Sequence, residues 1–117
     1  MTNIEIIERL EKRLEILYKK GEHGDTGYIW SEVINICKGS ISLFNEYEIS
    51  TKNQEEVRLK SIHYLKKAID EANKYPEPNE GFNVKEMRNK KFMLYRFLRP
   101  AREGIEHFIY NIEEKPL

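Results

Sequence analysis

Cysteine, tryptophan, proline and glycine are scarce in this sequence of 117 residues, with one, one, four and six of each. The single cysteine, Cys37, has no intramolecular disulfide partner, and it lies in an apolar run where a free thiol behaves as a small hydrophobic side chain. This usage favours a reducing cytoplasm. A chain of this length has room for one domain, residues 1–117, which buries enough surface to fold without a metal or a disulfide.

Long hydrophobic runs and net charge are also missing. Charged residues recur every few positions in the first segment, MTNIEIIERLEKRLEIL, so no part of the chain is expected to be exported or embedded in a membrane. Basic and acidic residues balance at 20 each, so the chain as a whole has no field to attract nucleic acid or an acidic surface. Any such preference must be local.

Apolar residues recur at the spacing of amphipathic helices along the whole chain. Thr2 and Glu5 form a capping box, which predicts a first helix over about residues 3–20. A second helix follows over about residues 28–48 and is apolar nearly all round, so we expect it to lie in the middle of a bundle. Gly39–Ser40 interrupts this helix, and small residues at that point let a neighbouring helix approach closely.

Thr51 and Gln54 form a second capping box, which begins a third helix that ends before Pro76. A loop at residues 76–81 leads to a fourth helix, and Pro100 must either kink that helix or start a new one, because proline donates no helical hydrogen bond. The positions that we expect in the core are Ile7, Leu10, Leu14, Leu17, Val57, Leu59, Ile62, Leu65, Ile69, Ala72, Met87, Leu94, Tyr95, Leu98, Ala101, Ile105, Phe108, Ile109 and Ile112.

Strand signals are lacking as well. Alternation of apolar and polar residues never persists, and no Asn-Gly or Asp-Gly hairpin dipeptide occurs. The fold class that follows is all-α: a compact antiparallel four-helix bundle whose last helix is broken or kinked at Pro100. The whole chain is expected to form this single helical domain.

Local charge is the most informative feature apart from the helices. Residues 85–102, the basic segment, contain seven basic side chains and one acidic side chain and carry +6 in a chain that is neutral overall. Aromatic residues lie among these cations. Three interpretations remain open: an interface for an acidic protein partner, a nucleic-acid interface, or a solvated helix face. The residues that we expect to contact a partner are Lys90, Lys91, Tyr95, Arg96 and Arg99.

Arg102 and His107 are separated by four residues on the last expected helix. This arrangement resembles the Arg-x4–6-His signature of the HEPN superfamily, which comprises small helical bundles that often dimerise and cut RNA. The resemblance implies a metal-independent ribonuclease in which Arg102 stabilises phosphate charge and His107 transfers a proton in a cleft at the dimer interface. Glu103 stands where that family commonly has Asn, Asp or His, and Arg58 with His63 repeats the spacing.

The same part of the chain also fits a purely structural interpretation. Side chains of opposite or potentially opposite charge lie four positions apart, where they stabilise an exposed helix: Arg99–Glu103, Arg102–Glu106 and Glu103–His107. A metal site has little support, since His23, His63 and His107 lie in three different segments. No cofactor is expected, because the sequence has neither a glycine-rich phosphate loop nor a dinucleotide-binding motif.

The simplest functional interpretation is a small cytoplasmic protein that binds another protein with an acidic surface. Inhibitors, immunity proteins and antitoxins of bacterial or phage origin belong to this class, and a composition rich in Ile, Lys, Glu, Asn and Tyr suits an AT-rich genome of that kind. The alternatives are a HEPN-like ribonuclease that uses Arg102 and His107, and a regulator that binds nucleic acid. A homodimer is a further possibility.

Overall fold

The computed structural model describes residues 1–22, 30–74 and 84–110, and for residues 19–22, 30–31 and 84–94 it describes the helix without the side chains. These ranges form four helices and contain no strand, so the all-α prediction is confirmed. The helices are α1 (Asn3–Glu22), α2 (Trp30–Glu46), α3 (Lys52–Asn73) and α4 (Val84–Tyr110).

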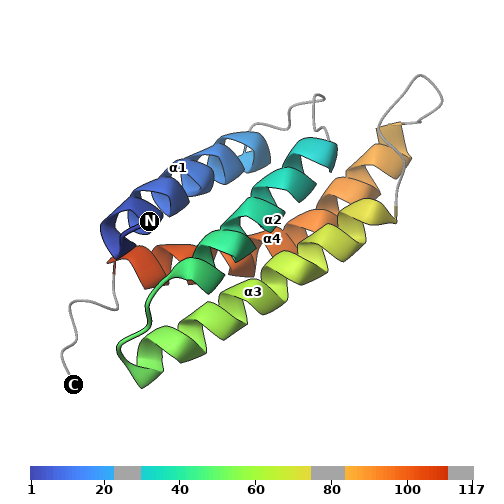
Figure 1. Cartoon of the computed structure of the whole chain (residues 1–117). Helices are drawn as coiled ribbons and strands as arrows, with labels where there is room; N and C mark the ends of the chain where they lie inside the picture. Colours follow the sequence, from blue (N-terminus) through green and yellow to red (C-terminus); the bar gives the residue numbers. More distant parts are fainter. Residues whose placement is uncertain (23–29, 75–83, 111–117) are drawn as a thin grey trace.

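The four helices pack in a ring. Helix α1 contacts α2 and α4, and α3 contacts the same two helices from the opposite side. Figure 1 shows that each helix runs antiparallel to the one before it, as expected for an antiparallel bundle with short connections. None of the described helices has the length and apolar character that crossing a membrane requires.

Hydrogen bonds at the helix starts follow the sequence closely. The backbone N–H of Gln54 donates to the Thr51 side chain at 3.1 Å, and the Gln54 side chain accepts from the Thr51 backbone N–H at 3.3 Å. Thr2 and Glu5 make the same reciprocal pair before α1, at 3.2 and 3.3 Å. Both predicted capping boxes are therefore present.

Helix α4 continues through Pro100. The ribbon changes direction near this residue, at the transition from orange to red in Figure 1. Proline removes one helical hydrogen bond and crowds the preceding turn, which accounts for the bend. Of the two alternatives in the sequence, the structure has the kinked helix.

The core lies inside the ring and receives side chains from all four helices. Phe108 of α4 packs edge-on against Phe44 at 5.0 Å and Tyr47 at 4.9 Å between ring centroids. Of the expected core positions, those buried are Leu10, Leu14, Leu17, Ile62, Leu65, Ala72, Leu98, Ala101, Ile105, Phe108 and Ile109, while Ile7, Val57, Ile69 and Tyr95 are half-buried. The side chains of Met87 and Leu94, and residue Ile112, lie outside the described residues.

The prediction for Leu59 is wrong, because its side chain is 55% exposed. Ser61, which is fully buried, lies on the inward side of α3. Leu59 precedes it by two residues, or about 200° around the helix axis, and therefore faces away from the bundle.

Two glycines lie where the helices pack, and they meet different neighbours. A Cβ on Gly39 of α2 would lie 2.5 to 2.8 Å from the guanidinium of Arg13, so the space beside this glycine holds an arginine side chain from α1. A Cβ on Gly104 of α4 would lie 3.2 Å from Cβ and 3.4 Å from Cα of Ser61 on α3. Gly104 therefore permits the closer approach of two helix backbones.

Candidate functional site

The basic segment forms most of α4 up to the bend. The side chains of Lys90 and Lys91 lie outside the described residues, so the structure places their helix but not their charges. Arg96 and Arg99 are exposed. Tyr95 is half-buried, and its hydroxyl accepts a hydrogen bond from Nη2 of Arg102 at 2.8 Å. Of the five residues expected to contact a partner, two are thus exposed cations and one is an aromatic ring turned partly inward.

Arg99 forms an ion pair on the outer surface of α4. Its Nε lies 3.4 Å from Oε1 of Glu103, and both side chains remain about two-thirds exposed, at 68% and 63%. The predicted pair at this spacing is therefore confirmed. Such an exposed pair contributes between 0 and ~1 kcal/mol, so it does not bind either side chain firmly.

A groove of about 350 Å³ runs between α3 and α4 on the outside of the bundle. Its lining comes from Val57, Lys60 and Tyr64 of α3 and from Pro100, Glu103, Gly104 and His107 of α4. These residues recur every three or four positions, so each helix lines the groove with a single stripe. Gly104 lies at the base, where α4 approaches Ser61.

Exposed cations flank this groove. Lys60 contributes from α3, and Lys67 lies on the same side of α3 two turns further along. Arg96 and Arg99 lie on the neighbouring side of α4. His63, also exposed, packs edge-on against the Tyr64 ring at 5.2 Å between ring centroids. The groove therefore combines apolar and aromatic lining with positive charge at its margins.

Arg102 and His107 lie in different environments. Arg102 is only 4% exposed, and its guanidinium carbon lies 4.5 Å from the Tyr18 ring centroid and 4.9 Å from that of Tyr95. His107 is exposed and lines the groove on the side of α3. Five residues correspond to about 140° around a helix, so the two side chains leave α4 in different directions. The structure does not bring them together around one space within a single chain.

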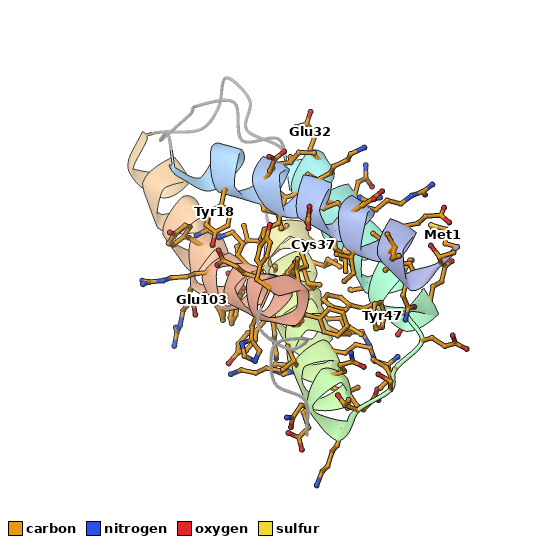
Figure 2. All side chains as sticks on the ribbon, turned by 90° about the vertical axis from the view of Figure 1, so that its left-hand side faces the viewer. Met1, Tyr18, Glu32, Cys37, Tyr47 and Glu103 are labelled. Carbon is orange, nitrogen blue, oxygen red and sulfur yellow. The ribbon has the colours of Figure 1, made fainter. Side chains whose placement is uncertain are left out.

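Tyr18 connects α1 to the same cluster. Its side chain projects from α1 toward α4 (Figure 2), and its hydroxyl donates to Oε2 of Glu106 at 2.8 Å. Burial and the hydrogen bond to Glu106 raise the pKa of Tyr18. Glu106, which the sequence pairs with Arg102, thus has a tyrosine from another helix as its hydrogen-bond partner.

Arg58 and His63, the second pair at the same spacing, lie apart on α3. Arg58 forms an ion pair with Glu55 at 2.6 Å, within its own helix. His63 is exposed beside Tyr64.

Cys37 lies inside the bundle (Figure 2) and is fully buried. Burial raises the pKa of its thiol to about 12, so the thiol stays protonated near neutral pH and is a poor nucleophile. Among the residues described, no group of three or more His, Cys, Asp and Glu side chains is placed to hold a metal ion. His23 lies outside the described residues.

Comparison with known protein families, with curated proteins and with solved structures gives no match for this chain.

Two features of the site were missed in the sequence. One is the groove, for which the available signal was the pattern Pro100, Gly104 and His107 along one side of the last helix. The other is the set of aromatic contacts around Arg102. Tyr95 precedes Arg102 by two helical turns, so the spacing along one helix could have predicted their contact. Tyr18 comes from another helix, and no nearby sequence pattern indicates its contact with Arg102.

Proposed function

We propose that this protein binds another protein with an acidic surface through its α3–α4 face. We define this face as the groove together with Lys67, Arg96 and Arg99 beside it. The observation that carries the proposal is the groove of about 350 Å³ with exposed cations from two helices at its margins. The partner's acidic side chains would pair with these cations while an apolar or aromatic side chain enters the groove.

The charge balance of the face supports an acidic partner. Its described cations are Lys60, Lys67, Arg96 and Arg99, and the exposed acids three or four positions from them are Glu56, Asp70 and Glu103. Glu103 already interacts with Arg99, yet both side chains stay accessible to a partner. A positive face in a neutral molecule orients an approaching acidic protein and speeds its association.

The aromatic and apolar lining supports a protein partner in particular. Tyr64, Pro100 and Val57 offer the groove a surface on which a side chain can be desolvated, and such contacts supply most of the affinity at protein interfaces. Charged residues at the margin chiefly set specificity and association rate. Inhibitors, immunity proteins and antitoxins of bacteria and phages work by this kind of contact, and we place the protein in this class.

The test is affinity capture from nuclease-treated bacterial lysate with three forms of the protein: wild type, Arg96→Glu/Arg99→Glu, and Lys12→Glu/Lys38→Glu. The last is a matched control, because it makes the same change in net charge at exposed positions of α1 and α2. We expect wild type and control to retain one specific protein, more weakly as salt rises, and the Arg96/Arg99 variant to lose it. Equal capture by both variants would contradict the proposal, as would a bound species that nuclease removes.

A further inference from the structure

Arg102 is a buried cation with unused hydrogen-bonding capacity. Its side chain is 4% exposed, and Nη2 donates to the Tyr95 hydroxyl at 2.8 Å. Nε and Nη1 are buried as well, and neither has an acceptor within the described part of the chain. A guanidinium carries five N–H groups, so two of its three nitrogens are unsatisfied.

The guanidinium of Arg102 is surrounded by aromatic rings, whereas a buried cation ordinarily has an anionic partner. The guanidinium carbon lies over the rings of Tyr18 and Tyr95, and no described carboxylate forms an ion pair with Arg102. Contacts with the faces of tyrosine rings are favourable, but they leave the N–H groups in the guanidinium plane without acceptors. A buried charge that is neither paired nor fully hydrogen-bonded is costly, and folded proteins rarely keep one without a reason.

Glu106, the acidic residue spaced to pair with Arg102, has another hydrogen-bond partner. Glu106 follows Arg102 by one helical turn, at a spacing that commonly forms an ion pair. Its Oε2 instead accepts the Tyr18 hydroxyl at 2.8 Å. The chain thus positions Arg102 in a cluster of aromatic and polar side chains without neutralising it.

We propose that Arg102 binds a small oxyanion from solution, carrying a phosphate or a carboxylate group. Guanidinium N–H groups match the oxygens of both groups in spacing and direction, and such charge-assisted hydrogen bonds are about twice as strong as neutral ones. This site lies on the side of α4 that faces α1, so it is separate from the α3–α4 face and goes beyond the function proposed above.

Tyr95 is the part of the cluster that the anion displaces. The unsatisfied N–H groups on Nε and Nη1 point outward in the plane of the guanidinium, so an anion must approach them through that plane. Tyr95 is half-buried, so it lies at the edge of the cluster, and its hydroxyl is a neutral acceptor for Nη2. An anionic oxygen replaces that acceptor with a stronger one. Tyr18 is half-buried as well, but its hydroxyl already donates to Glu106 and is not a partner of Arg102.

The test follows thermal unfolding while sodium phosphate or sodium acetate is added at neutral pH, with total ionic strength held constant by sodium chloride. Wild type is compared with Arg102→Met and with Arg9→Met, a control that removes an exposed arginine from α1. We expect a saturable rise in Tm for wild type and Arg9→Met, and its complete loss in Arg102→Met. A response to phosphate alone identifies a phosphate ligand, and a response to acetate alone identifies a carboxylate.

A second variant gives an answer even if Arg102→Met fails to fold. Tyr95→Phe keeps the ring but removes the hydroxyl that competes for Nη2, so we expect the responding anion to bind several-fold more tightly than to wild type. Two results would overturn the proposal: no saturable response to either anion in wild type, or the same response in Arg102→Met as in wild type. Unchanged affinity in Tyr95→Phe would overturn the role of Tyr95 as the displaced group.

Discussion

Gly104 of α4 lies directly against Ser61 of α3, so closely that a methyl group on the glycine would come within 3.2 Å of the serine Cβ. The serine hydroxyl oxygen lies nearer still to that position, and it is held there by a hydrogen bond that it donates to the carbonyl of Val57 at 2.7 Å. This contact sets the distance between the two helices that line the groove. The groove therefore depends on a residue that adds no side chain to it.

Gly104→Ala is expected to lower the free energy of unfolding. Overpacking against Ser61 costs ~1–3 kcal/mol, which outweighs the gain of up to ~1 kcal/mol from the helix propensity of alanine. Urea denaturation followed by circular dichroism measures the difference. Gly39→Ala is the matched control: its methyl group meets the far end of a long side chain, Arg13, which can shift at low cost, so the helix propensity gain should dominate and stability should stay equal or rise. A Gly104→Ala protein at least as stable as wild type would disprove the close packing.

Cys37 makes stability depend on alkaline pH. Burial raises the pKa of the folded thiol to about 12, so above pH 9 the unfolded chain loses a proton that the folded chain retains. The contribution of this thiol is full below the pKa of the unfolded state and declines as pH rises toward 12. We expect wild type to lose ~1.5–2 kcal/mol relative to Cys37→Ala between pH 7.5 and pH 10. Urea denaturation of both proteins at each pH gives this difference, and parallel curves would refute the assignment.

The ribonuclease hypothesis has a direct test in RNA cleavage. Arg102 is buried between two tyrosines while His107 faces the groove, so we expect purified protein to leave a mixed RNA pool intact. Denaturing gels of RNA incubated with and without the protein provide the measurement. Cleavage that disappears in His107→Ala, with thermal stability unchanged, would instead establish the HEPN-like activity.

Sequence patterns within single helices were enough to predict most of the fold. The capping box at Thr51 and Gln54 requires only residues three positions apart, and the structure has it as the sequence predicts. Helical periodicity likewise placed Leu65, Ile105 and Phe108 in the core. The prediction for Leu59 was wrong because the apolar stripe was extended to a position on the outer side of α3. An exposed apolar side chain is common in folded proteins, so its apolar character alone did not show that it is buried.

The site was less accessible to sequence reasoning because its contacts join distant segments. Spacing on one helix correctly paired Arg99 with Glu103. The same rule paired Arg102 with Glu106, yet Tyr18, 88 positions before Glu106, takes that carboxylate in the folded chain. Which partner an acidic side chain selects depends on the helix packed beside it, and a single helical stretch holds no information about that neighbour.

Because Arg99 pairs with Glu103, Glu103 competes with any partner's carboxylate for Arg99 on the α3–α4 face. If the proposed partner binds here, its carboxylate would replace that of Glu103 at Arg99, and Glu103 would return to water at little net cost. The affinity for a partner at Arg99 would therefore change when Glu103 alone is substituted. Evolution could weaken or strengthen attachment by altering Glu103 while every cation stays in place.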